Sequence, residues 1–342
     1  MQVLQTAEYL RKRGIAVDVR LTNEDIDYQQ YDLLHFFNII RPADILRHIS
    51  RSRKPYVVST IFVDYSEYER KARGGTAGLL ARYLSSDLIE YLKVIARRVV
   101  NGERIVSPSY LVFGQRGSIR RIIRGAAMLL PNSASEYHRL YAHYRQEQRY
   151  SVIPNAIDPL LFRRPDVLPE RDSRLVICVG RIEGRKNQLN LIRALNGTPY
   201  QLIIIGSPSA NQVAYYEECK KAAGPNVSFI AATDQPTLLG YYLTAKVHAL
   251  ASWFETTGLS SLEAAAMGCN LVITGKGDTR EYFREEAWYC DPASPDSIRE
   301  AVQRAAKAEF NGSLQKRIFS EYTWAQTAAK TADAYDAALQ KT

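Results

Sequence analysis

Two glutamates eight positions apart, Glu255 and Glu263, stand where a strand is predicted to become a helix. The apolar run 247–251 precedes them, and Gly258 lies between them. A turn of this kind points free backbone N–H groups outward, and such groups at the start of a helix attract phosphate. Carboxylates do not favour phosphate, so we expect the pair to accept hydrogen bonds from hydroxyl groups. Phosphate beside several hydroxyls is the chemistry of a nucleotide sugar.

A second strand-to-helix connection carries two cations, Arg181 and Lys186. The buried run 175–179 precedes them and a helical pattern, 189–195, follows. They therefore fall at the carboxyl end of a parallel strand, where open α/β sheets bind ligands. Two fixed cations there can hold a diphosphate and stabilise it as it leaves. Solvated loop charges are the alternative for this pair alone, and the glutamate pair disfavours it.

These motifs together resemble the nucleotide-sugar half of the retaining family 4 glycosyltransferases, the glycosyl transferases group 1, which have the GT-B fold. The resemblance extends over about residues 125 to 339, whereas residues 62–124 match only loosely. The segments that carry it are 179–186, the stretch from Glu255 through Gly258 and Leu259 to Glu263, a Pro-Asn-Ala-Ile-Asp junction within 152–158, a Gly-x-x-x-Glu element at 277–281, and Tyr-Thr-Trp at 322–324.

The resemblance implies two Rossmann-like, doubly wound parallel-sheet domains facing across a cleft. We place an acceptor-binding domain at 1–155, a proline-rich linker at 156–173 and a nucleotide-sugar-binding domain at 174–323. A last helix, 324–342, is expected to cross back to the first domain. A chain of 342 residues with 46% hydrophobic content is long enough for two domains.

The resemblance also implies roles for individual residues. Arg181 and Lys186 contact the diphosphate, Glu263 holds the nucleotide ribose, and Glu255 faces hydroxyls of the donor sugar. The reaction in this family is usually described as front-face attack, with no settled protein nucleophile. The candidate catalytic residues are Glu255, Arg181, Lys186 and Asp64. The candidate nucleotide-sugar-binding residues are Gly180, Arg181, Lys186, Glu255, Thr257, Gly258, Leu259 and Glu263.

Neither a cofactor nor a metal is expected. Asp25 and Asp27 form an Asp-x-Asp pair, the spacing with which the other large glycosyltransferase fold holds a divalent ion. They stand in a polar stretch between two predicted strands, where helix capping or turn chemistry explains them better. The four cysteines form no Cys-x-x-Cys pair and are typical of reduced thiols.

The first domain departs from the family pattern after strand 56–61. Many relatives carry a histidine there, whereas this chain has Phe62. Asp64 is the nearest polar candidate to contact acceptor or donor sugar, and a helix cap is its structural alternative. His35 lies in another predicted strand, where the alternative is a buried histidine. We assign neither as the general base.

Apolar strand-like runs alternate with helical patterns along most of the chain, which is typical of parallel sheets with crossover helices. The chain begins with the pattern of a helix and second strand, so the family's first strand is missing. We expect that about 15 to 20 residues are absent from the start, at strand-plus-loop lengths. The predicted strands are 16–21, 32–36, 56–61, 127–130, 175–179, 201–205, 227–230, 247–251 and 271–274.

Basic charge is concentrated in one segment. From Arg70 to Arg124 there are twelve Lys or Arg and three acids, a surplus equal to the net charge of +9 of the whole chain. Apolar residues recur there at helical spacing, so the segment suits an anionic membrane surface or a lipid-linked diphosphate. A core-packing helix with a solvated basic face is the alternative. Nucleic acid is disfavoured as a partner, because no zinc-finger, helix-turn-helix or RNA-binding motif accompanies the charge.

The sequence therefore predicts a metal-independent, retaining hexosyltransferase that moves a sugar from a nucleotide sugar to a glycan or lipid-linked glycan. We expect it in bacterial surface polysaccharide biosynthesis, such as that of lipopolysaccharide, in the cytoplasm and peripheral on the inner face of the membrane. A catalytically impaired nucleotide-sugar-binding protein and a nucleotide-sugar epimerase of the same fold remain alternatives.

Overall fold

The structure, a computed structural model, describes residues 1–64, 67–68, 87–88, 91, 108–163, 170–310 and 312–340. The described residues form two compact units. The N-terminal unit contains those up to Asn155 together with those from Trp324 onward, and the C-terminal unit contains those of Ala156–Thr323. Most of the predicted basic segment 70–124 and residues 164–169 of the predicted linker lie outside the described residues.

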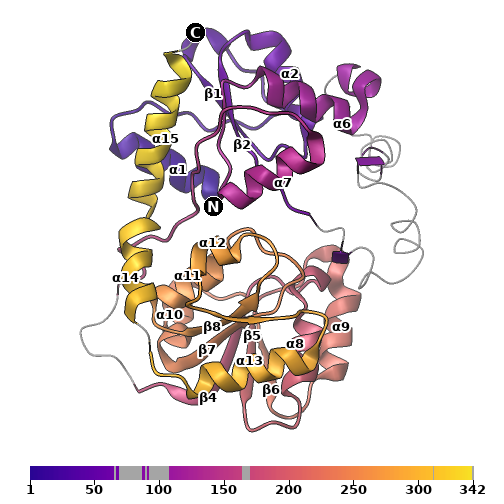
Figure 1. The fold of residues 1–342 in the computed structure, drawn as a ribbon, viewed down its shortest axis with the longest axis vertical. Coiled ribbons are helices and arrows are strands. Elements are labelled where there is room, and N and C mark those ends of the chain that lie inside the picture. The colour runs from indigo at the N-terminus through magenta and orange to yellow at the C-terminus, as the bar shows by residue number, and fades with distance from the viewer. Residues whose placement is uncertain are drawn as a thin grey trace. The chain divides into compact units, whose positions relative to one another are not determined.

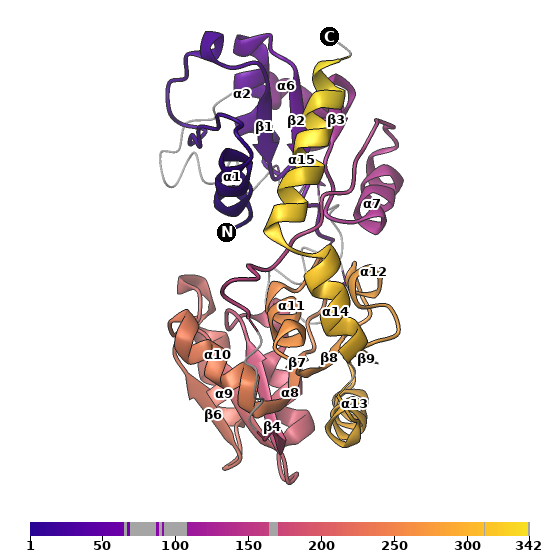
Figure 2. The same ribbon diagram turned by 90° about the vertical axis from the view of Figure 1, so that its left-hand side faces the viewer.

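The N-terminal unit is built on a parallel sheet in the order β1-β2-β3, of which β1 and β2 are labelled in Figure 1 and all three strands in Figure 2. Each of its strands overlaps a predicted one, at 32–36, 56–61 and 127–130. The strands are β1 (Leu34–Phe37), β2 (Tyr56–Ser59) and β3 (Met128–Leu129). The helices are α1 (Gln2–Lys12), the 3-10 turn η1 (Tyr28–Gln30), α2 (Pro42–Ser52), α6 (Pro108–Gly125, kinked at Gly114), α7 (Ala134–Tyr144) and α15 (Trp324–Leu339).

The predicted strand 16–21 is wrong, because these residues have irregular backbone. A strand needs a ladder partner for its N–H and C=O groups, and in the described part of the chain no strand ladder or isolated bridge includes any of these residues. Val19 and Leu21, which the strand would have buried on one face, remain exposed.

Helix α15 lies beside α1 and against β2, although the two helices are at opposite ends of the sequence (Figure 2). Its inner face carries Ala334 and Ala338, which pack against Val57 and Leu130. Small alanines let the helix approach the sheet closely. The N-terminal unit is therefore completed by the last helix of the chain.

The C-terminal unit contains a six-stranded parallel sheet in the order β6-β5-β4-β7-β8-β9. All five strands predicted for this part of the chain are confirmed, whereas β9 was not predicted. Sequential strands run outward from β4 on one side and from β7 on the other, so the direction of winding reverses between β4 and β7. Ligands of open α/β sheets bind outside the carboxyl ends of the strands at such a reversal. The strands are β4 (Asp172–Val179), β5 (Gln201–Ile205), β6 (Val227–Ile230), β7 (Ala245–Leu250), β8 (Asn270–Thr274) and β9 (Trp288–Cys290).

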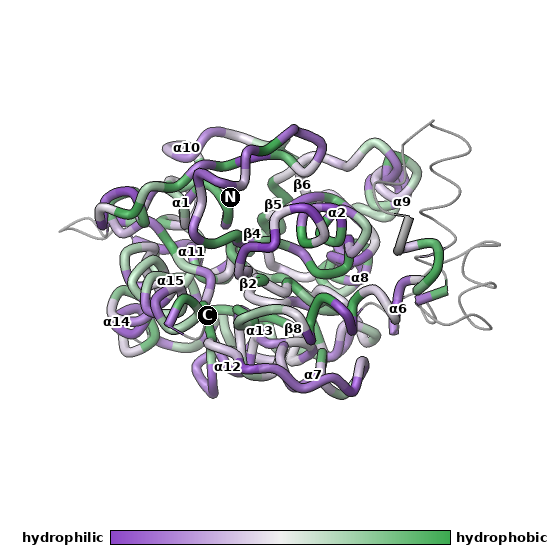
Figure 3. Tube along the Cα trace, turned by 90° about the horizontal axis from the view of Figure 1, so that it is seen from above, coloured by the Kyte–Doolittle hydropathy of each residue, from purple (hydrophilic) through white to green (hydrophobic). Residues whose placement is uncertain are grey.

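Helices cover this sheet and bury its central strands. Helix α13 packs on α8 and contacts β7, β8 and β9, while α11 packs on α14 and contacts β7 and β8. The helices carry hydrophobic and hydrophilic residues in alternation, as helices with one buried face do (Figure 3). None of the helices in the described ranges combines the length and apolar composition that crossing a bilayer requires. The helices are η2 (Gly184–Lys186), α8 (Gln188–Leu195), η3 (Ala210–Gln212), α9 (Val213–Ala222), α10 (Gln235–Thr244), α11 (Leu259–Ala266), α12 (Thr279–Phe283), α13 (Pro295–Lys307) and α14 (Gly312–Glu321).

Candidate functional site

The predicted site residues of the C-terminal unit gather at the carboxyl ends of β4 and β7. Arg181 and Lys186 follow β4, and Glu255 lies in the loop after β7. Gly258, at φ 68°, takes the left-handed conformation that starts α11, which is accessible to glycine at little cost. Glu263 lies on that helix. The predicted placement of one carboxylate in a loop and the other on a helix is therefore confirmed.

Lys186 and Glu255 meet directly, although 69 positions separate them. The ammonium donates to Oε1 of the carboxylate at 2.6 Å, and the two side chains are 24% and 8% exposed. Glu255 in particular needs this partner, because without Lys186 its carboxylate would be a buried charge without compensation. The structure thus brings the proposed phosphate-binding cation and the proposed sugar-binding carboxylate into one ion pair.

Two further cations converge on Glu183, which the sequence analysis did not identify. Arg185 Nη2 lies 2.9 and 3.1 Å from the two carboxylate oxygens, and Arg181 Nη2 lies 3.7 Å from one of them. The Glu183 carboxylate is buried, whereas Arg181 is 66% exposed. Arg181 is consequently held loosely and can move toward an anionic ligand. The Arg-x-Glu-x-Arg spacing after the strand was the available signal for this cluster.

Glu263 on α11 is hydrogen-bonded by Tyr242 of α10. The phenol donates to Oε2 of Glu263 at 3.0 Å, and the ring of Tyr242 is fully buried. Burial raises the pKa of Glu263 to about 7, while the hydrogen bond from Tyr242 lowers it. Glu263 is therefore close to half ionised near neutral pH.

The backbone at Glu255 is fixed by a close approach to Gly277. A Cβ at Gly277 would stand 2.0 Å from the carbonyl oxygen of Glu255, and Gly277 has a φ of 94°. Lys276 O accepts from Glu255 N at 3.3 Å, and Glu255 O accepts from Asp278 N at 2.9 Å. The glycine of the Gly-x-x-x-Glu element thus has a physical reason: any side chain there would displace the Glu255 loop.

A buried histidine underlies the site but is not a candidate base. His248 on β7 is fully buried, and its Nε2 lies 3.2 Å from the hydroxyl of Ser261. Burial and the nearby Lys186 lower its pKa to about 3. It is therefore neutral at physiological pH and closed off from solvent, so it supports α11 rather than exchanging protons with a ligand.

The remaining sequence candidates lie in the N-terminal unit. Asp64 is exposed in the segment after β2, whereas the Phe62 side chain is buried. His35 is tied on both ring nitrogens, 2.7 Å from the Tyr335 hydroxyl and 2.9 Å from that of Ser59. Burial lowers its pKa to about 3, so this half-buried His35 is neutral near pH 7 and has a structural role through its two hydrogen bonds.

No part of the described chain offers a metal cluster of three or more His, Cys, Asp or Glu side chains. Asp27 accepts from Gln29 N at 3.1 Å and caps η1, and Asp25 lies 3.5 Å from Arg47. Turn chemistry therefore explains Asp27 of the Asp-x-Asp pair.

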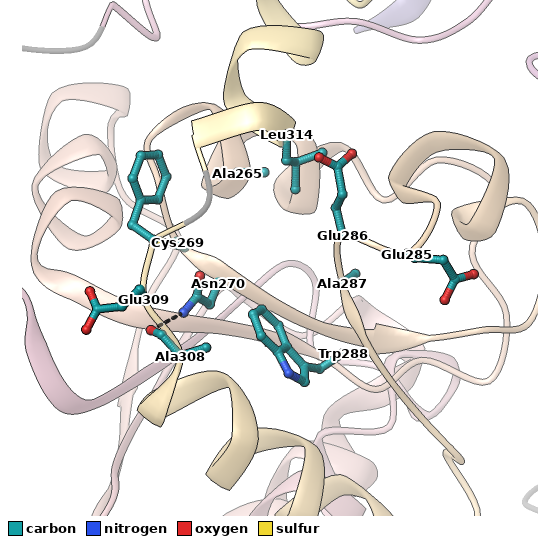
Figure 4. Close-up of a pocket in the computed structure, with 11 residues that line it drawn as sticks. Ala265, Cys269, Asn270, Glu285, Glu286, Ala287, Trp288, Ala308, Glu309 and Leu314 are labelled. Atoms are coloured by element: carbon teal, nitrogen blue, oxygen red, sulfur yellow. Dashed lines mark hydrogen bonds between the residues drawn. The ribbon is translucent and has the colours of Figure 1, made fainter.

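A cavity of about 310 Å³ opens elsewhere in the C-terminal unit, among residues that include Asn270, Trp288 and Phe310 (Figure 4). Asn270 and Trp288 are the first residues of β8 and β9. This cavity is thus at the amino ends of the strands, the opposite edge from Lys186 and Glu255, and we do not assign the donor to it.

Known glycosyltransferases are similar in sequence to this chain. An uncharacterized glycosyltransferase of Methanocaldococcus jannaschii is 27% identical over 57% of this chain, which spans only 55% of that relative's length. A D-inositol 3-phosphate glycosyltransferase of Nocardioides is 26% identical over 97% of this chain and 83% of its own length.

Solved structures share the fold. The sucrose-phosphate synthase of Thermosynechococcus elongatus aligns with a TM-score of 0.68 at 18% identity, over 92% of this chain and 75% of that one. Anabaena HepE, solved with UDP, aligns with a TM-score of 0.58 at 14% identity, over 90% of this chain and 100% of that one. The two parallel-sheet units are those of the GT-B fold, as predicted.

Residues 162–322, which lie within the C-terminal unit and include every predicted donor-site residue from Arg181 onward, match the family model described as Glycosyl transferases group 1. The predicted resemblance to the group 1 glycosyl transferases is confirmed by this match and by the glycosyltransferases among the relatives.

Proposed function

We propose that this protein is a retaining, metal-independent glycosyltransferase that moves a sugar from a nucleotide sugar to a glycan or lipid-linked acceptor. The observation that carries the proposal is the direct contact between Lys186 and Glu255 at the point where the C-terminal sheet reverses its winding. One of these side chains suits phosphate and the other suits hydroxyls, and a nucleotide sugar presents both groups within a few bonds of each other.

In the proposed complex the diphosphate lies against Lys186 and Arg181, with the backbone N–H groups around Gly258 and Leu259 as further donors. Glu263 accepts from the ribose hydroxyls and Glu255 from the hydroxyls of the sugar. Anabaena HepE, whose structures were solved with UDP and with UDP and glucose, supports such a ligand in this fold.

Retention would follow from attack on the face of the sugar that the diphosphate leaves. The acceptor oxygen bonds to the anomeric carbon, the bond from that carbon to the phosphate oxygen breaks, and the acceptor's proton passes to a phosphate oxygen. Positive charge at Lys186 and Arg181 stabilises the negative charge that develops on the leaving diphosphate. Glu255, already bound to Lys186 at 2.6 Å, acts here by positioning the sugar.

The proposed acceptor is supported by proteins similar to this chain and by one end of the basic segment. Relatives include a phosphatidylinositol N-acetylglucosaminyltransferase subunit of Arabidopsis thaliana and a lipopolysaccharide outer core galactosyltransferase. On α6 the run Leu111, Val112 and Phe113 is exposed, and the Arg121 guanidinium lies 5.3 Å from the Phe113 ring. Exposed apolar side chains beside cations suit an anionic membrane surface, and we propose a cytoplasmic, peripheral membrane location.

The test begins with donor binding. A panel of nucleotide sugars is screened for an increase in melting temperature, because a ligand that binds the native state stabilises it. The best ligand is then incubated with membrane lipid extract, and transfer of its labelled sugar is followed with and without Glu255→Ala. Transfer that this variant abolishes supports the proposal. Retained binding without transfer or hydrolysis favours the inactive binding protein, and isomerisation of the nucleotide sugar favours the epimerase.

Membrane attachment is tested separately with vesicles of neutral and anionic lipids. Neutralising Arg97, Arg98, Arg120 and Arg121 should abolish sedimentation with the anionic vesicles. Unchanged sedimentation would remove the membrane surface from the proposal while leaving donor binding intact.

A further inference from the structure

Glu136 is a fully buried carboxylate in the N-terminal unit to which the proposed reaction assigns no role. Its Oε1 accepts from Phe62 N at 2.8 Å and from the hydroxyl of Thr60, and its Oε2 accepts from Asn132 N at 3.0 Å. A buried carboxylate is costly unless its oxygens are satisfied. Here Asn132 is 4 positions from Glu136, whereas Phe62 and Thr60 are 74 and 76 positions from it.

The location in helix α7 shows that this carboxylate is diverted from its usual task. Ser133 caps α7 by accepting from Glu136 N at 2.9 Å, which is one half of a capping box. In the usual capping box the glutamate side chain returns to the N–H of the cap residue. Glu136 instead reaches across to the segment that follows β2.

The segment that Glu136 holds has a backbone that needs support. Ile61, between Thr60 and Phe62, has a φ of 45°, a conformation that is a genuine outlier for a β-branched residue. Such residues persist only where their surroundings fix them, and they are concentrated at functional sites. Glu136 binds the residue on either side of Ile61, and Arg139 Nη2 donates to Phe62 O at 3.2 Å. Helix α7 therefore clamps this backbone from both ends.

The clamped segment lies where a ligand of this sheet is expected. Thr60 follows the last residue of β2, and Asn132 follows β3 by three positions, so both are at the carboxyl edge of the parallel sheet. Open α/β sheets bind ligands at that edge. Asp64, the exposed acidic side chain of this segment, comes two positions after Phe62.

We propose that Glu136 is a positioning residue for the proposed transfer: it fixes the strained backbone at Ile61 and so sets where Asp64 meets the acceptor or the sugar. This inference rests on the proposed function for its consequence in catalysis, but the clamp itself is a property of the N-terminal unit alone. Glu136 touches no reacting group and acts only through the segment that it holds.

The chain offers a matched set of variants. Glu136→Gln keeps the size of the side chain but replaces one acceptor oxygen by a donor, so it cannot satisfy Phe62 N and Asn132 N together. Thr60→Val removes only the hydroxyl that bonds Glu136. Ser133→Ala removes the cap of the same helix without touching the segment after β2, and it serves as the control for a general loss of stability.

The first measurement is amide hydrogen exchange. We expect exchange at Phe62 to be at least about tenfold faster in Glu136→Gln than in the wild-type chain, because local opening governs exchange, and close to the wild-type rate in Ser133→Ala. The second is kinetic. We expect kcat for sugar transfer to fall about tenfold or more in Glu136→Gln, with KM for the nucleotide sugar within about twofold, since the donor site belongs to the other unit.

Unchanged exchange at Phe62 in Glu136→Gln would overturn the proposal. So would an equal loss of kcat in Ser133→Ala, or a loss in Glu136→Gln confined to the KM for the nucleotide sugar. An absence of transfer by the wild-type chain would count against the proposed function instead, and the exchange measurement would still decide whether the clamp exists.

Discussion

Nucleotide binding should depend on pH through Glu263, and Tyr242 should set the pH at which it changes. Burial raises the pKa of Glu263 to about 7. In the proposed complex the ionised carboxylate accepts hydrogen bonds from the ribose, whereas the protonated form has less capacity to accept. With a pKa near 7, the ionised fraction rises about tenfold between pH 6 and pH 8, which corresponds to about 1.4 kcal/mol of binding free energy.

As the pH rises, ionisation of Glu263 changes the free energy of unfolding in the opposite direction to the affinity for the nucleotide. Because its pKa is higher in the folded than in the unfolded chain, its contribution is fully present below its unfolded pKa near 4.5 and is lost as the pH rises through about 7. The free energy of unfolding should thus fall by up to about 3 kcal/mol over this range, while affinity for the nucleotide increases.

Tyr242→Phe separates the effect of the Tyr242 hydrogen bond on the pKa of Glu263 from the effect of burial. The ring stays in place, but the hydrogen bond at 3.0 Å is lost, and that bond lowers the pKa of Glu263. A hydrogen bond to a charged group contributes about 1.5–3 kcal/mol, so the rise in affinity should move upward by about one pH unit or more.

Isothermal titration from pH 5.5 to 8.5 measures the affinity of the wild-type chain and of Tyr242→Phe for UDP, and GDP serves as a second ligand. Glu263→Gln is the necessary control, because the terminal phosphate of either ligand also titrates near pH 6 and this variant retains only that contribution. The reasoning would be refuted by an identical pH profile in the wild-type chain and in Glu263→Gln.

Three further predictions concern the ion pair, the glycine beside it and the metal. Lys186→Met should abolish UDP binding and, by leaving the Glu255 carboxylate unpaired, lower the free energy of unfolding by about 2–4 kcal/mol. When Glu255→Gln is added to this variant, urea denaturation should show that stability recovers, and isothermal titration should show that UDP binding does not. Gly277→Ala should lower the melting temperature and weaken UDP binding. Gly197→Ala is the control, because Gly197 also has a positive φ but no atom lies within 4 Å of the added Cβ. It should change the free energy of unfolding by only about 1 kcal/mol. Prolonged treatment with EDTA should leave sugar transfer at its full rate, and a loss restored by Mg²⁺ or Mn²⁺ would contradict metal independence.

Much of the fold follows from apolar runs in the sequence. The runs at 201–205 and 227–230 correspond to β5 and β6 residue for residue, because buried parallel strands are continuous apolar segments. Residues 16–21 have strand-like composition but no ladder partner among the described strands, and composition does not reveal the partner. β9, only three residues long and partly buried, is too short for any periodicity to mark it.

The site was predictable only as far as its motifs extend. Lys186 and Glu255 could be assigned because each follows a buried strand at a connection that binds ligands. Tyr242 and Glu136 escaped, because their importance lies in what they touch: Tyr242 meets a residue 21 positions away, and Glu136 meets one 76 positions away. Such pairings are set by how helices dock on the sheet, and no local spacing encodes them.

The pairing of charges at the site bears on how it would distinguish a nucleotide sugar from a bare nucleotide. In the structure Lys186 is paired with Glu255, and Arg185 with Glu183. A diphosphate that draws Lys186 toward itself weakens the bond to Glu255, leaving a buried carboxylate short of a donor, and this costs free energy. A nucleotide sugar supplies that donor through its hydroxyls, whereas UDP does not. In the proposed reaction the site therefore favours the substrate, and after transfer the return of Lys186 to Glu255 favours release of the nucleotide.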